Sequence, residues 1–124
     1  IMIETWQSDE YGEYSYDNGF ARFVPDNVTK KYNLNTIKPG SVQNFDGRLQ
    51  SPHISFSISC RGINMNLNTR MYFESDNLNK DPLISLIKKS NNNINSLIAK
   101  KIDENSYIFD IFLQGEQETI FLDV

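Results

Sequence analysis

Few side chains in this sequence could do chemistry, and they gather on one stretch. The chain has one histidine, His53, and one cysteine, Cys60, and Arg61 follows the cysteine directly. Alternate side chains of a strand point to opposite faces, so His53 and Arg61 share a face and Cys60 does not. This parity argues against a thiol–imidazole pair. A single histidine also argues against a metal centre, since several ligands must converge on the ion.

Arg61 is therefore the most interesting of the three. A guanidinium group presents a planar fork of donors that fits a carboxylate, and Arg61 precedes a glycine, Gly62, at which a strand can bend. Two interpretations stay open: Arg61 binds the carboxylate of a ligand, or it pairs with a local acidic residue. For His53, the pattern favours a strand histidine that is hydrogen-bonded to its neighbours.

The elements that position these residues follow from hydrophobic alternation. Ile54, Phe56 and Ile58 alternate with polar residues, which predicts a strand with one apolar and one polar face, and a second alternating run follows Gly62. Asp81 and Pro82 have the types expected of an N-cap and a first helical residue. Further strands are predicted over residues 1–7, 30–37, 97–102, 107–113 and 119–124.

Short strands, frequent turns and one helical signal predict an all-β fold, an antiparallel β-sandwich with one short helix. Its length predicts one domain, residues 1–124. The core between the sheets is expected to contain these residues: Ile54, Phe56, Ile58, Met65, Leu67, Phe73, Phe109, Ile111 and Leu113.

Composition excludes several classes of function. The formal net charge of −4 disfavours binding to nucleic acid or to an anionic membrane. No apolar run is long enough to span a membrane. A single cysteine rules out an internal disulfide bond, which fits a cytoplasmic location.

Several segments together resemble the α subunits of the protocatechuate 3,4-dioxygenase family, which belong to the intradiol ring-cleaving dioxygenases. They occur in the family's order and cover nearly the whole chain: TWQSDEYGEY at 5–14, TIKPG at 36–40, PHIS at 52–55, RGIN at 61–64, TRMYFESD at 69–76, SLIAKK at 96–101 and YIFDIFLQGEQETIFLDV at 107–124. The family subunit is longer, so we expect that residues 1–124 lack its N-terminal segment.

The resemblance implies a lost metal site. The family's iron-bearing subunits hold non-haem Fe(III) with two tyrosines and two histidines; Tyr14 and His53 match one of each. Val42 and Ser55 stand at the other two positions, and neither replaces the missing ligand. We therefore expect no iron on this chain and no complete catalytic set, with Fe(III) bound by a partner β subunit.

The resemblance also implies a function. The complex would cleave protocatechuate, an aromatic diol, with O₂ to give 3-carboxy-cis,cis-muconate, and Arg61 matches an arginine of the substrate pocket. Two alternatives remain. One is a catalytically inactive β-sandwich that serves as a binding or scaffold module; the other, disfavoured by the single histidine, is a homomeric iron enzyme.

Overall fold

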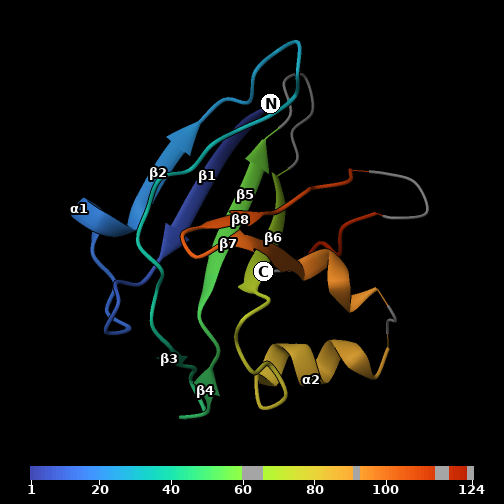
Figure 1. The fold of residues 1–124 in the computed structure, drawn as a ribbon. Coiled ribbons are helices and arrows are strands. Elements are labelled where there is room, and N and C mark those ends of the chain that lie inside the picture. The colour runs from blue at the N-terminus through green and yellow to red at the C-terminus, as the bar shows by residue number, and fades with distance from the viewer. Residues whose placement is uncertain (60–65, 91–92, 114–117, 123–124) are drawn as a thin grey trace.

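The computed structural model describes residues 1–59, 66–90, 93–113 and 118–122. Its main element is a six-stranded sheet with the order β2-β1-β5-β6-β7-β8 (Figure 1). The strands are β1 (Met2–Gln7), β2 (Phe20–Phe23), β5 (His53–Ser59), β6 (Asn66–Phe73), β7 (Ile98–Asp103) and β8 (Ser106–Ile108). A separate two-stranded sheet pairs β3 (Val42–Gln43) with β4 (Leu49–Gln50). The helical elements are α1 (Tyr16–Gly19), α2 (Pro82–Lys88) and the 3₁₀ turn η1 (Ile94–Leu97).

The register of the large sheet gives it two unlike faces. On one face, Ile3 of β1 lies beside Ile58 of β5, and Ile58 lies beside Leu67 of β6. On the other face, Trp6 lies beside Ser55, and Ser55 lies beside Arg70. The first face is apolar and buried, and we call the second the polar face.

The main core lies on the apolar face. Its buried members include Ile3, Ile54, Phe56, Ile58 and Phe109. Irregular chain covers them: residues 24–41 run lengthwise past the sheet down to β3 (Figure 1), and residues of this segment and of 109–111 pack on the core. A second cluster packs α2 against the polar face near the C-terminal end of β6. Its buried members are Tyr72, Ile84, Ile87 and Leu97.

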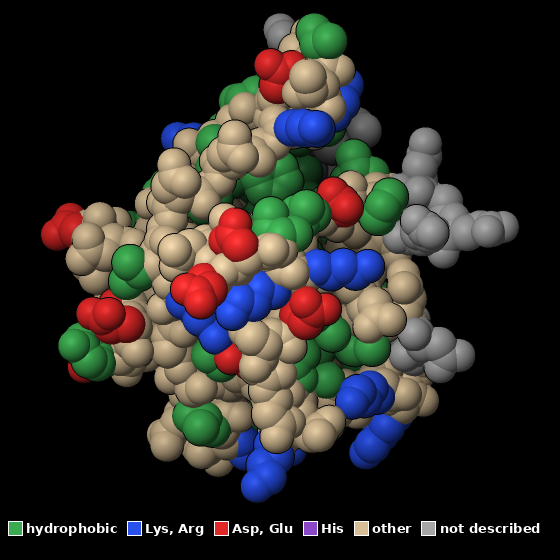
Figure 2. All heavy atoms as spheres, in the orientation of Figure 1, with side chains coloured by type: hydrophobic (Ala, Val, Ile, Leu, Met, Phe, Trp, Pro, Cys, Tyr) green, Lys and Arg blue, Asp and Glu red, His purple; other side chains and the backbone are tan. Residues whose placement is uncertain are grey.

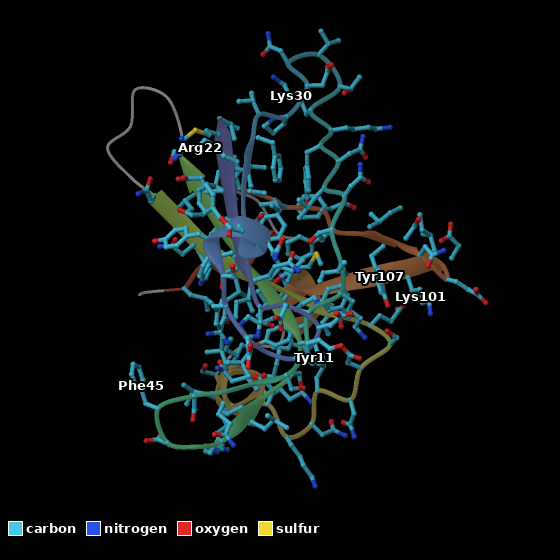
Figure 3. All side chains as sticks on the ribbon, turned by 90° about the vertical axis from the view of Figure 1, so that its left-hand side faces the viewer. Tyr11, Arg22, Lys30, Phe45, Lys101 and Tyr107 are labelled. Carbon is cyan, nitrogen blue, oxygen red and sulfur yellow. The ribbon has the colours of Figure 1, made fainter. Side chains whose placement is uncertain are left out.

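An edge-on view separates the two sides of the sheet. Arg22, which pairs across β1 and β2 with polar-face Glu4, lies on one side, whereas Tyr107 and Lys101 lie on the other (Figure 3). Acidic and basic side chains are interspersed over the middle of the surface shown in Figure 2, and basic side chains lie along its lower edge.

Helix α2 begins as its sequence predicts. Asp81 is the N-cap, its carboxylate accepts hydrogen bonds from the backbone N–H groups of Leu83 and Ile84, and Pro82 is the first helical residue. Among the described residues, no helix is long and apolar enough to cross a membrane.

The all-β class with one short helix is confirmed, as are the strands over 1–7 and 97–102 within a residue or so. Residues 30–37 form no strand, because Tyr32 and Leu34 pack their side chains on the core while their backbone joins no sheet. The predicted strand over 107–113 ends at Ile108, and residues 119–122 form none. One pairing, β6 with β7, is parallel.

The predicted core is mostly confirmed. Ile54, Phe56, Ile58, Phe73 and Phe109 are buried. Leu67 and Ile111 pack partly buried against them. The prediction for Leu113 is wrong, since its side chain is 38% exposed. Met65 and the expected bend at Gly62 lie outside the described residues.

Candidate functional site

Two of the four matched positions meet at one residue, Trp6. Ser55 is the register partner of Trp6, and the ring of Tyr14 stacks on the Trp6 indole with 5.2 Å between centroids and 16° between planes. His53 lies two residues before Ser55 on the same face of β5. The polar face therefore gathers Tyr14, His53 and Ser55 around one end of β1 and β5.

His53 is buried, with 4% of its surface exposed, although it belongs to the polar face. Its Nδ1 lies 2.9 Å from the carbonyl oxygen of Ser51. Because a carbonyl only accepts, Nδ1 carries the proton and Nε2 is left with the lone pair in the neutral ring. Burial lowers the pKa of His53, and the positive charge of Arg70 lowers it further, while the Ser51 hydrogen bond and the charge of Asp81 oppose the shift. The expectation of a hydrogen-bonded strand histidine agrees with this geometry.

Arg70 is the residue that the sequence analysis missed. It lies on β6 directly opposite Ser55, and its Nη1 donates to Gln50 Oε1 at 2.8 Å and to the Tyr72 hydroxyl at 3.2 Å. One sign of its position was present in the sequence: Arg70, in the segment TRMYFESD, alternates in step with the polar residues of its strand. Its position opposite Ser55 depends on the register of β5 with β6.

A buried hydrogen-bond chain holds Arg70 in place. The Tyr72 hydroxyl accepts from Arg70 and donates to Asp81 Oδ1 at 3.1 Å. Asp81 is completely buried and also accepts from the backbone N–H groups of Ser51, Leu83 and Ile84. Burial raises the pKa of Tyr72, which therefore stays a neutral hydroxyl able to donate and accept at once.

The charge of Arg70 also affects the pKa of Tyr14, the tyrosine that matches a family ligand position. Burial raises the pKa of Tyr14, and the nearby Arg70 opposes that rise. Arg70 thus acts electrostatically on Tyr14, His53 and Tyr72 together, and it is the cation around which the polar groups of this site are arranged.

The donor set does not fit ferric iron. This hard cation prefers anionic oxygen ligands and imidazole, yet Val42 carries only hydrocarbon and Ser55 a neutral hydroxyl. Arg70, already positive, lies opposite Ser55. Within the described ranges, no three His, Cys, Asp or Glu side chains are placed to hold a metal ion. Arg61, the predicted substrate-binding residue, lies outside those ranges, as does Cys60.

A hollow of about 630 Å³ opens on the polar face between the sheet and α2. Its sheet side carries Trp6, Ser55 and Arg70, and its helix side carries Leu83, Leu86 and Ile87. Glu4, the register partner of Arg22, also lines it, so the hollow belongs to the side of the sheet on which Figure 3 shows Arg22. Its described residues therefore combine the cation Arg70 with hydroxyl groups and an apolar wall, which suits binding of an organic acid better than metal chemistry.

Comparisons with known proteins agree with the resemblance in the sequence. A family model described as "Dioxygenase" matches residues 1–115. The protocatechuate 3,4-dioxygenase alpha chain of Pseudomonas putida is 39% identical over 98% of this chain and 66% of its own length. The alpha chain of the same name from Burkholderia cepacia is 30% identical over 99% of this chain and 68% of its own length. The chain therefore spans about two thirds of the length of these relatives.

Proposed function

Since this chain belongs to the dioxygenase family, we propose that it is the alpha-type, iron-free subunit of a protocatechuate 3,4-dioxygenase. The names of both relatives support an alpha chain, and that word implies an assembly with a second kind of chain. In this proposal the partner is a β-type subunit, which binds the Fe(III) of the enzyme.

The donor set is the observation that carries the proposal. Two of four ligand positions hold Val42 and Ser55, and a cation, Arg70, lies opposite Ser55. An iron enzyme built from this chain alone would have to bind its metal beside a fixed positive charge. An iron-free subunit has no such conflict, which is why we assign the ring-opening chemistry to the partner.

The proposed reaction inserts both atoms of O₂ between the two hydroxylated carbons of protocatechuate, giving 3-carboxy-cis,cis-muconate. This chain contributes to the substrate pocket through Arg61, whose position matches the family's pocket arginine. A guanidinium binds the ring carboxylate of the substrate in charge-assisted hydrogen bonds. The role of Arg61 rests on the sequence match alone.

The test uses the chain assembled with a β-type subunit. Arg61→Ala should lower kcat/KM for protocatechuate by about one to two decades, the cost of one charge-assisted hydrogen bond. Catechol lacks the carboxylate and should lose much less activity. Arg48→Ala is the matched control, because it removes the same charge from an exposed residue at another position in the chain. An equal loss with both substrates would show that Arg61 does not read the carboxylate, and no loss would leave it a structural ion-pair partner.

A further inference from the structure

We propose that the hollow beside Arg70 is a binding site for a small carboxylic acid with an apolar body. This site belongs to the chain itself and requires neither iron nor turnover, so it goes beyond the subunit role proposed above. Three features of the described residues carry the inference: the free donors of Arg70, the absence of a carboxylate that neutralises it, and the shape of the hollow.

Arg70 has donors to spare. Both hydrogen bonds that it makes use Nη1, one to Gln50 and one to the Tyr72 hydroxyl. Within the described part of the chain, Nε and Nη2 have no hydrogen-bond partner. These bonds fix the plane of the guanidinium group and leave the N–H groups of Nε and Nη2 open, which is the arrangement that a carboxylate can occupy.

The acidic side chains around Arg70 that belong to the described residues are engaged with other donors. Of the acids around it, Glu4 also lines the hollow, but its Oε2 accepts from Arg22 at 2.8 and 3.1 Å. Asp81 reaches Arg70 only through the Tyr72 hydroxyl, and its own oxygens already accept from four donors. Among the described residues, Arg70 forms no salt bridge. A half-buried cation that has no counterion in the described part of the chain gains from an anion that enters the hollow.

The hollow suits an apolar body beside that anion. Its volume of about 630 Å³ is within the range of small-molecule sites. Leu83, Leu86 and Ile87 of α2 form an apolar wall opposite the polar sheet residues. A ligand that places a carboxylate at Arg70 can therefore lay a hydrocarbon or aromatic body against the helix.

The experiment is a calorimetric titration of the full chain with benzoate, with benzyl alcohol as a neutral ligand of similar size and acetate as an acid without an apolar body. Benzoate should bind and the other two should bind much more weakly. Arg70→Gln should weaken benzoate binding by about tenfold or more, the value of a charge-assisted hydrogen bond. Lys101→Gln removes one positive charge from an exposed position on the other side of the sheet (Figure 3) and should leave the affinity unchanged.

A second variant tests the site independently, in case Arg70→Gln does not fold. Leu86 is 64% exposed, so Leu86→Glu should fold normally, and its negative charge at the helix wall should weaken benzoate binding while sparing benzyl alcohol. The proposal is overturned if benzoate does not bind, if benzyl alcohol binds equally well, or if both Arg70→Gln and Leu86→Glu bind benzoate like the unmodified chain. Iron content and ring-cleaving activity do not enter these readouts, so a failure here is distinct from a failure of the proposed subunit role.

Discussion

Ser55 and Arg70 face each other across strands β5 and β6. Ser55 stands at a position where the resemblance implies a histidine ligand, so a fixed cation lies beside that position. Arg70 interacts with several neighbouring groups. The Tyr72 hydroxyl links it to buried Asp81, and its charge opposes the rise that burial causes in the pKa of Tyr14 and adds to the lowering of the pKa of His53.

Restoring the ligands should therefore fail to restore iron. Val42→Tyr with Ser55→His supplies the missing donor types, yet the positive charge of Arg70 still repels Fe(III) beside them. Adding Arg70→Ser to this double variant should raise the iron content. Metal analysis and the visible charge-transfer band of an iron phenolate measure both variants. One tightly bound iron per chain in the double variant would contradict this electrostatic account.

His53 should make folding stability fall in acid. Its folded-state pKa is lowered, by burial first and by Arg70 second, so the unfolded chain binds more protons in this range. The free energy of unfolding should drop as the pH falls from about 6.5, the ordinary histidine value, and level off below the folded-state pKa. His53→Asn keeps a donor for the Ser51 carbonyl and should remove this part of the pH dependence. Urea unfolding curves across the range compare the two, and identical slopes would refute the assignment.

Asp81 should matter more than an ordinary N-cap. It accepts from three backbone N–H groups and from the Tyr72 hydroxyl while fully buried. Asp81→Ala leaves those donors without partners, so the cost should exceed the roughly 1 kcal/mol of a simple cap and reach about 2–5 kcal/mol. Exposed Asp26, whose carboxylate accepts from the backbone N–H groups of Val28 and Thr29 in a turn, is the control; Asp26→Ala should cost clearly less. Chemical denaturation measures both, and equal losses would contradict the prediction.

Phe56 should be the most costly single truncation of the main core. Its ring is 2% exposed and contacts the rings of Tyr32 and Phe109, with centroids 6.1 and 5.4 Å away. Phe56→Ala should cost about 3–5 kcal/mol. Phe45, fully exposed at the turn between β3 and β4 (Figure 3), is the matched control and should cost almost nothing as alanine. A small loss at Phe56 would mean that the core on the apolar face is misassigned.

Local patterns predicted much of the fold. Alternation placed Ile54, Phe56 and Ile58 on one face, and the Asp81–Pro82 pair placed the start of α2. Alternation misled at Tyr32 and Leu34, because side chains can pack on a sheet from a segment whose backbone pairs with none. The Ser55–Arg70 pair was out of reach for a different reason: it depends on the register between two strands, and one sequence does not give that register.

The most direct test of the central claim measures iron and activity in three samples: this chain alone, a β-type subunit alone, and the two purified together after coexpression. The account predicts no stoichiometric iron and no cleavage of protocatechuate by this chain alone. It predicts an assembly that contains one iron per pair of chains and forms 3-carboxy-cis,cis-muconate. One iron per chain with ring cleavage by this chain alone would contradict it.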